Sequence, residues 1–461
     1  MPSLAQKSGF AAIISAAMGV SGCGPTYDGF AANAPLPPGE YTTDRDLPRR
    51  EWQPIIEPVQ GGTTEAHPKV GTLSLKEAVG RVVHHSPALK AAFLEIQAKR
   101  GEELQASVKP NPELRAELED FLGSGTRSGF ESSQETVSIV QLFEFGDKRV
   151  KRLKAANLDT AVSVWQLETI RVQTILLAVQ AYIDVQAAQE RIAVLQKSSG
   201  LTDNMQRAVL KRIDVGNTSP IELDRAKVAT ARAKAAVKDE QVRFDASRLR
   251  LSALWGSNRS DFERAAGKLG DGIHVPSPER VLAYVDDNPL VAQWTDEIGR
   301  RGAVLDVEIA KSVRDYTIGG GVRHYSDGDD AAVVLSVSTP LKLFDTNAGA
   351  ITAAEQRMAK AQHERDAAKV ALTGSVAEAL SMLSVAASQM RSLEREVLPA
   401  AESAYEKTQK GYEEARFDLL NVFDAQRTLF EVRLDLVNSK ADYEKAKSQV
   451  EALIGRPLSD L

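Results

Sequence analysis

The fifteen residues AYIDVQAAQERIAVL (181–195) have a counterpart 198 residues further along the chain, ALSMLSVAASQMRSL (379–393). Apolar and small residues fall in the same places in both stretches, so that Val185 corresponds to Leu383 and Ala188 to Ala386. Self-similarity at long range is the first feature to settle, because it decides how the whole chain is divided. The correspondence predicts that the chain contains two structural copies.

Other stretches repeat at nearly the same interval. VSIVQLFEF (137–145) corresponds to LSVSTPLKL (335–343), and LSALWG (251–256) corresponds to VEALIG (450–455). Each copy has the pattern of a short helix, two strands, a very long helix, a turn and a second long helix. We therefore predict a tandem duplication.

The duplication divides the sequence into six parts. The boundaries are a signal peptide at 1–22, a Pro- and Gly-rich tether at 23–70, a first copy at 71–256, a linker at 257–286, a second copy at 287–455 and a tail at 456–461. Strands are expected near 112–145 and 316–344, and helical hairpins near 147–255 and 345–455.

Composition excludes several classes of function. The net charge is −6 and the pI is near 5.7, whereas nucleic-acid-binding proteins usually carry an excess of positive charge. The six histidines and the single cysteine show no metal-ligand spacing, and no nucleophile, phosphate-loop or nucleotide motif is present. The sequence therefore predicts no enzyme, no cofactor and no chelating metal site.

The N-terminus predicts export and a lipid anchor. The apolar run FAAIISAAMGV (10–20) is too short to span a bilayer comfortably, and it leads into VSGC (20–23), which resembles a bacterial lipobox. Lipidation would fall on Cys23, and the alternative is an ordinary signal peptide with an incidental cysteine. Gly24 stands where inner-membrane lipoproteins tend to have Asp, which implies the outer membrane. After Cys23 no stretch approaches 18 consecutive apolar residues.

A proline-free run from Asp147 to Lys211 predicts a helix roughly 100 Å long. Apolar residues spaced 4-3-4-3 predict a coiled-coil seam along it. They are Leu158, Val162, Trp165, Thr169, Val172, Leu176, Val179 and Ile183, repeated in the second copy by Val376, Leu380, Leu383, Ala387 and Met390. Ile170 and Leu177 lie off this line and suggest contacts on a second side.

Two strand regions alternate between apolar and polar residues: ELRAELE (113–119) and the stretch from Val333 to Leu343. Such alternation fits a half-buried sheet in a soluble domain or a membrane barrel. Four strands cannot close a barrel, so membrane insertion would require several chains. Two chains would supply about eight strands with a filled interior, and three about twelve with an open lumen.

A lipidated cysteine, a Pro-rich tether and two copies of a strand hairpin plus a long helical hairpin resemble the TolC-type outer-membrane factors of Gram-negative efflux systems. LFEFGDKRVKRLKAA (142–156) is most similar to the cobalt–zinc–cadmium branch of that family. The resemblance implies a mainly α fold with a small membrane β part, in which duplicated helical hairpins form a trimeric α-barrel tunnel and four strands per chain join a twelve-stranded β-barrel. It also implies a homotrimer in outer-membrane lipid, with a periplasmic adaptor and a proton-driven inner-membrane pump as partners.

The resemblance places adaptor docking at the turns of the two hairpins, which otherwise read as ordinary helix caps. The residues concerned are Val215, Gly216, Asn217 and Thr218 in the first turn and Ala415, Arg416, Phe417 and Asp418 in the second. Ala415 stands where the first copy has Gly216, so the second turn departs from the pattern.

Related channels narrow their tip with acidic side chains. NVFDA (421–425) keeps Asp424 but has Asn421 at the earlier acidic place, and the first copy offers Glu222 and Asp224 nearby. Rings of carboxylates would concentrate cations at a constriction, whereas the plainer interpretation is solvated acids at helix starts.

The sequence thus predicts a passive outer-membrane exit duct for heavy-metal cations. The alternatives are a channel for drugs or organic solutes and, in another class, a lipid-anchored periplasmic coiled-coil scaffold.

Overall fold

The computed structural model describes residues 70–214, 219–270 and 272–460. All of them belong to one compact unit, residues 62–461. The predicted signal peptide and Cys23 lie outside the described residues, and so does nearly all of the predicted tether.

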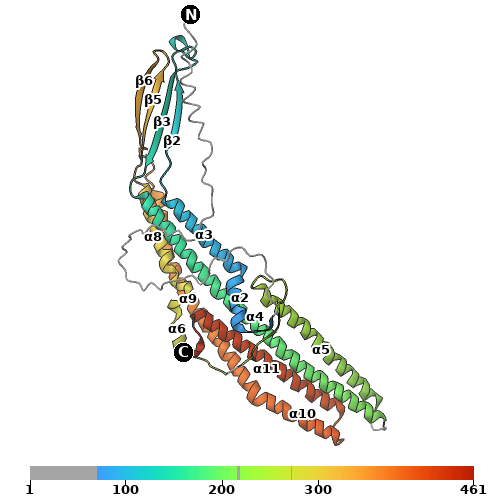
Figure 1. Ribbon diagram of the computed structural model, residues 1–461. Helices are drawn as coiled ribbons and strands as arrows, with labels where there is room; N and C mark the ends of the chain where they lie inside the picture. The colour runs from blue at the N-terminus through green and yellow to red at the C-terminus, as the bar shows by residue number, and fades with distance from the viewer. Residues whose placement is uncertain (1–69, 215–218, 271, 461) are drawn as a thin grey trace. The chain divides into compact units, whose positions relative to one another are not determined.

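The same order of elements occurs twice in this unit (Figure 1). The first series comprises α2 (Leu75–His85), α3 (Pro87–Ser107), β2 (Glu113–Glu119), β3 (Gln134–Phe143), α4 (Lys148–Asp214) and α5 (Pro220–Ala253). The second comprises α6 (Pro278–Leu282), α7 (Pro289–Ala292), α8 (Trp294–Lys311), β5 (Tyr316–Tyr325), β6 (Asp330–Ser338), α9 (Ala348–Ser392), α10 (Leu398–Glu413) and α11 (Leu419–Ile454). Helices dominate, as the sequence predicted.

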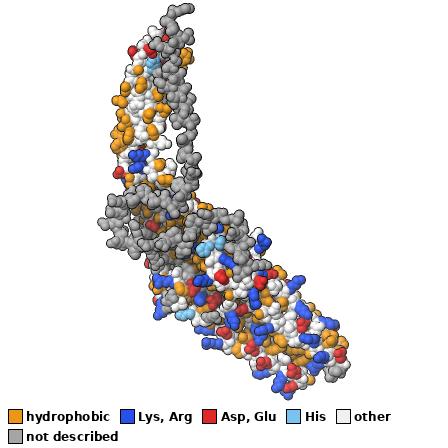
Figure 2. Space-filling model, viewed as in Figure 1, with side chains coloured by type: hydrophobic (Ala, Val, Ile, Leu, Met, Phe, Trp, Pro, Cys, Tyr) orange, Lys and Arg blue, Asp and Glu red, His pale blue; other side chains and the backbone are white. Residues whose placement is uncertain are grey.

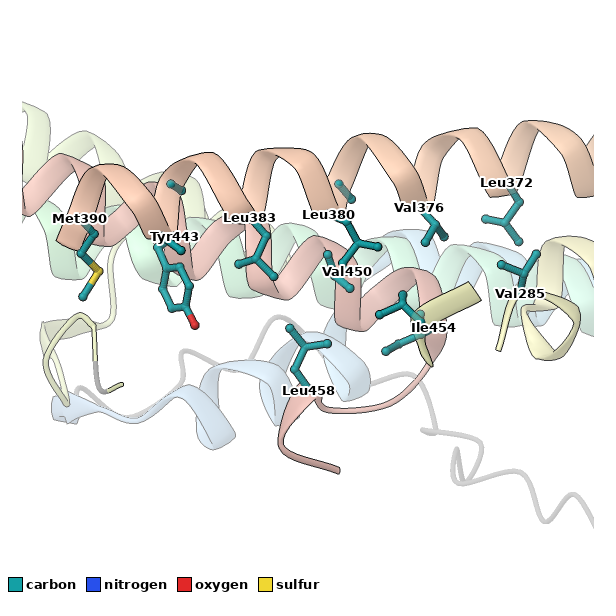
Figure 3. Packing of buried hydrophobic residues seen from close by; sticks show 14 residues of the cluster. Val285, Leu372, Val376, Leu380, Leu383, Met390, Tyr443, Val450, Ile454 and Leu458 are labelled. Carbon is teal, nitrogen blue, oxygen red and sulfur yellow. The ribbon is translucent and has the colours of Figure 1, made fainter. Parts of the chain in front are cut away.

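The core sits where the long helices of each series meet. Val185 and Leu251 are fully buried in the first cluster, and their counterparts Leu383 and Val450 are fully buried in the second. Figure 3 shows Leu380, Leu383 and Met390 along α9 facing Tyr443 and Val450 of α11. Burying each such side chain stabilises the fold by about 1.5–3 kcal/mol. The predicted seam in α9 is confirmed, because all five of its residues are buried.

The predicted seam in α4 is wrong in part. Only Val162 and Ile183 of its eight residues are buried, while Leu167, Ala178 and Val185 form the more deeply buried line. The reason is that α4 contacts α3, α5, α8 and α11 at different heights, so it does not follow one partner with a fixed heptad register. Ile170 does pack on the α3 cluster, whereas Leu177 is 54% exposed.

The long helices of the two copies differ at one place. Gly200 lies inside α4, which runs through it without a break. Its counterpart, Pro399, follows a π-helical turn at Leu393–Val397 that separates α9 from α10. Proline lacks an N–H and crowds the preceding turn, and the wider π turn accommodates this. The Leu398 N–H accordingly bonds the carbonyl of Leu393, five residues earlier.

The predicted linker contains structure that the sequence did not reveal. Strand β1 (Val70–Leu73) pairs in parallel with β4 (Phe262–Ala265). The Tyr182 hydroxyl donates to the carbonyls of Leu73 and Ala266 at 2.9 and 2.8 Å, and burial raises the pKa of Tyr182. The start and end of the first copy are therefore held together on α4.

The four remaining strands form an antiparallel sheet in the order β2-β3-β5-β6. The register aligns Val137 with Val322 and Val333, and Ile139 with Gly320 and Leu335. Strand β2 has the predicted bounds. Strand β6 ends at Ser338, so the prediction that Leu341 and Leu343 continue it is wrong. Pro340 cannot donate a ladder hydrogen bond, and Thr339 Oγ1 instead donates to the carbonyl of Asp315 at 2.8 Å.

One described helical run is apolar enough to cross a membrane by length and composition. It spans Ala348–Glu413, and 39% of its most apolar 18-residue window is buried. Because Val376, Leu380 and Leu383 of this run pack against α11 or its neighbours, we interpret it as a core helix.

Three consecutive glycines, Gly319–Gly321, cross the middle of β5 and give the first prediction. A Cβ on Gly321 would collide with the Val137 carbonyl and lie 2.5 Å from Ser138 Cβ, whereas one on Gly320 would meet only Leu335 Cδ2 at 3.7 Å. We expect Gly321→Ala to destabilise the sheet by about 1–3 kcal/mol. Thermal unfolding in detergent measures this, with Gly320→Ala as the matched control. Equal midpoints for the two variants would contradict the close approach.

Candidate functional site

The two helical hairpins end in turns that lie at the same end of the helices (Figure 1). In the first turn, α4 ends at Asp214 and α5 begins at Pro220, with Ser219 as its N-cap. Ser219 Oγ accepts from the Ile221 N–H at 3.4 Å. Val215, Gly216, Asn217 and Thr218 lie outside the described residues, so their docking role stays a prediction.

The second turn is closed by a backbone loop around Gly411. The N–H groups of Arg416 and Phe417 donate to the Gly411 carbonyl at 2.7 and 3.2 Å. Ala415 has a φ of +58°, the left-handed conformation that glycine adopts without cost. A non-glycine residue there costs about 1–2 kcal/mol. The second turn thus keeps a glycine-like backbone although the sequence has alanine.

An apolar cluster joins the two turns. Val209 of α4, Tyr412 of α10 and Leu419 and Val422 of α11 are buried together, with Leu223 of α5 partly buried against them. Each hairpin contributes to this cluster, so the tip of one cannot move far without uncovering apolar surface of the other. Phe417 is 48% exposed at its edge.

A charged group from the first copy contacts the Tyr412 ring. The Arg212 guanidinium lies 4.6 Å from the ring centroid, a cation–π contact. Burial raises the pKa of Tyr412, and neighbouring Glu222 acts in the same direction, while Arg212 acts against it. Glu222 therefore lies beside Tyr412 at the contact between hairpins. Glu222 is thus part of the contact between the two copies.

Asn421 and Asp424 lie together on α11. They line one shallow groove of about 400 Å³ with Phe417, Thr408 and Thr428. The Asp424 side chain is 64% exposed and pairs with Arg427 at 2.7 Å. Arg416 pairs with Glu414 at 3.1 Å, and Asp418 is the N-cap residue of α11 without a side-chain capping bond.

Asp224 lies on a different surface. Its side chain is 76% exposed, pairs with Lys227 at 3.2 Å and lines a second groove of about 510 Å³ with Leu420 and Phe423. Of the four predicted constriction residues, the structure thus brings Asn421 and Asp424 to one groove and places Glu222 and Asp224 elsewhere. Sequence reasoning missed Tyr412 and Arg212, because neither fits a motif and they meet only across hairpins.

The described residues contain no group of three or more His, Cys, Asp or Glu side chains placed to hold a metal ion. One acid and several apolar side chains line each groove, with threonine hydroxyls in the first and two arginines, Arg225 and Arg232, in the second.

The chain belongs to the outer membrane efflux protein family. The family model matches residues 79–257 and 316–456, one segment in each copy.

The chain is 30% identical over 386 residues to the cobalt-zinc-cadmium resistance protein CzcC of Cupriavidus metallidurans, covering 84% of this chain and 91% of that protein. It is 26% identical to the nickel and cobalt resistance protein CnrC of the same organism, over 65% and 71% of the two chains. The crystal structure of CusC superimposes with a TM-score of 0.71 over 86% of this chain and 96% of that one, at 14% identity.

The tight second turn gives the second prediction. A Cβ on Gly411 would collide with the Phe417 ring, whose Cε2 would lie at 2.6 Å, so we expect Gly411→Ala to open the turn and destabilise the tip by about 1–3 kcal/mol. Gly374 of α9 has open space around it, and Gly374→Ala should stabilise its helix by up to about 1 kcal/mol. Hydrogen exchange of the two segments measures both effects. Slower exchange around Phe417 in Gly411→Ala would show that the predicted collision is absent.

Proposed function

We propose that three copies of this chain assemble into an outer-membrane duct through which heavy-metal cations leave the cell. The observation that carries the proposal is the exposed apolar face of the sheet. Val333, Leu335 and Val337 of β6 are 71–82% exposed, and Ile139 of β3 is 60% exposed. Monomeric soluble proteins rarely present such a contiguous apolar surface to water.

Strand length and aromatic positions support insertion in a bilayer. Strands β3 and β5 have 10 residues and β6 has 9, within the roughly 9–11 that a tilted strand needs to cross. At one end of the sheet Phe121 and Phe130 stack with centroids 5.8 Å apart, and at the other Phe145 meets Tyr316 edge-on at 5.3 Å. Aromatic girdles flank the apolar band of outer-membrane barrels in this way.

The opposite face of the sheet is polar. Arg323 of β5 donates to Thr136 and Gln134 of β3 at 2.9 and 3.0 Å and pairs with Glu119 of β2 at 3.1 Å. Apolar and polar residues therefore alternate between lipid-facing and lumen-facing positions.

The open sheet edges support assembly of several chains. Within the described residues β2 and β6 each have one strand neighbour, and unpaired backbone groups are not tolerated in hydrocarbon. Joining β6 of one copy to β2 of the next satisfies both edges. Three copies give about twelve strands and an open lumen, whereas two would give about eight and a filled interior.

Exposed apolar side chains on the helices support the same assembly. Val228 and Val242 of α5, Val370 and Val385 of α9 and Leu177 of α4 are each 53–73% exposed. Packing against neighbouring copies would cover them and form the helical tunnel. Lipidation of Cys23 would add an anchor in the same membrane, with the tunnel in the periplasm.

The named relatives support metal cations as cargo, and the tip supports a gate. The cluster around Tyr412 and the Arg212–Tyr412 contact hold the two hairpins together, and docking of a periplasmic adaptor on the turns would compete with these contacts. A proton-driven inner-membrane pump would deliver the ions. Threefold repetition of Asp424 beside Asn421 would concentrate cations at the constriction.

The assembly gives the third prediction. The mature protein should require detergent and sediment as a trimer, because only neighbours complete its sheet. Sedimentation equilibrium measures the mass. A water-soluble monomer after removal of the acyl group would refute the proposed duct and favour a periplasmic scaffold. A dimer would refute the proposal that the barrel has an open lumen.

The cargo gives the fourth prediction. Deleting the gene should increase sensitivity to zinc, cobalt and cadmium, and the wild-type gene should restore growth. We expect Asp424→Asn to restore metal resistance only partly, because three charges leave the constriction. Minimal inhibitory concentrations measure both effects.

The matched control is Asp366→Asn on α9, an exposed acid that pairs with its neighbour Arg365 at 2.8 Å. It should restore resistance fully. If the deletion strain becomes sensitive to organic solutes and not to metals, the proposed cargo is wrong. If Asp424→Asn restores resistance fully, the proposed acidic ring is wrong.

A further inference from the structure

We propose that Arg149 and Arg314, at the junction between the sheet and the helices, bind the phosphate groups of anionic phospholipids. The inference rests on the proposed insertion of the sheet, which brings this junction to the level of the headgroups. It adds a defined lipid site, with named residues, to that insertion.

Three segments far apart in the sequence converge at this junction. Lys148, the first residue of α4, donates from Nζ to the Val313 carbonyl at 2.8 Å and to Asp315 at 2.6 Å. Lys342, after β6, donates to the same Val313 carbonyl at 3.1 Å. A Cβ on Gly146 would lie 2.8 Å from Val313 Cγ2, so only glycine allows this approach. Arg149 and Arg314 are each adjacent in sequence to a residue of this contact, so both belong to the segments that meet at the junction.

Among the described residues, two cations of this junction have no ion-pair partner. Asp315 pairs with Lys148, and the Lys342 ammonium is satisfied by backbone carbonyls that carry no net charge. Arg149 and Arg314 are exposed, and within the described residues no carboxylate lies within ion-pair distance of either. Two guanidinium groups therefore remain available for an anion, and guanidinium matches phosphate in a bidentate geometry.

Exposed apolar side chains lie in the same segments of the chain as these cations. Phe344 is 99% exposed, Leu343 69%, Phe145 49% and Val313 40%. In Figure 2, Lys and Arg side chains lie at the base of the sheet beside its apolar side chains. Cations interleaved with exposed apolar groups fit the boundary between hydrocarbon and headgroups, where the guanidinium reaches the phosphate and the apolar groups remain in lipid.

A lipid explains both features better than a docked protein would. Phe145 of the junction contacts Tyr316 at the start of β5, so the junction adjoins the sheet, whose proposed surroundings are lipid. The occupant is therefore the anionic headgroup of a phospholipid in the same bilayer.

The test uses the full-length protein in detergent with mixtures of phosphatidylglycerol and phosphatidylethanolamine, and native mass spectrometry counts the bound lipids. We expect the wild type to prefer phosphatidylglycerol. Each juxtamembrane cation contributes about fivefold, so Arg149→Gln with Arg314→Gln should lower the preference by about 25-fold. Arg149→Lys with Arg314→Lys should retain most of it, because the charge remains.

The matched control removes two exposed cations elsewhere, Lys238→Gln on α5 and Lys407→Gln on α10, and should leave the preference unchanged. Wild type without any preference, an unchanged preference in the double Gln variant, or displacement of phosphatidylglycerol by inorganic phosphate alone would each overturn the lipid site. If the double Gln variant does not fold, loss of the wild-type preference in 0.5 M salt replaces it as the test, since screening weakens exposed charges.

Flotation with vesicles of phosphatidylethanolamine alone separates this inference from the proposed function. A protein that inserts in these vesicles but shows no preference for phosphatidylglycerol refutes the lipid site and leaves the duct intact. A protein that inserts in no vesicle refutes the proposed duct.

Discussion

The backbone hydrogen bonds at the edges of the four-stranded sheet constrain everything else in this protein. Strands β2 and β6 each have one neighbour in the described residues, and the apolar face between them is open. In hydrocarbon such edges cannot remain unpaired, so the proposed insertion of the sheet requires neighbouring chains. The exposed apolar side chains of α5 and α9 support the same proposed assembly in the helical part. A single requirement for neighbours thus connects the sheet, the helices and the proposed duct.

The two copies have matching cores, and two of the differences between them lie in the second hairpin. Both cores place small or branched side chains at corresponding buried positions, such as Val185 and Leu383. The π turn before Pro399 interrupts only the second long helix. Ala415 adopts a glycine-like conformation in the second turn. The helices of the second hairpin are therefore less regular than α4 of the first hairpin. The second hairpin also contains Asn421 and Asp424.

The junction between sheet and helices has two roles in this interpretation. Lys148, Gly146 and Asp315 hold the start of the first long helix against the segment that precedes β5 in the second copy. Arg149 and Arg314, beside that contact, are exposed and pair with no carboxylate among the described residues, so they can interact with the lipid headgroups that we propose. The Gly-Asp-Lys-Arg stretch at residues 146–149 therefore acts both in holding the copies together and, as we propose, in positioning the protein in its membrane.

The sequence by itself determined the duplication, the long helices, the bounds of β2 and the family, because these depend on local periodicity, on the absence of proline and on long-range similarity. It could not determine which face of α4 is buried, since that face changes as the helix passes four different neighbours. The end of β6 was open to sequence reasoning, because Pro340 cannot donate a ladder hydrogen bond. The sequence could not locate β1 against β4 or the Arg212–Tyr412 contact. Each of these depends on groups that are distant in sequence and meet only after the hairpins pack, so only the tertiary structure decided them.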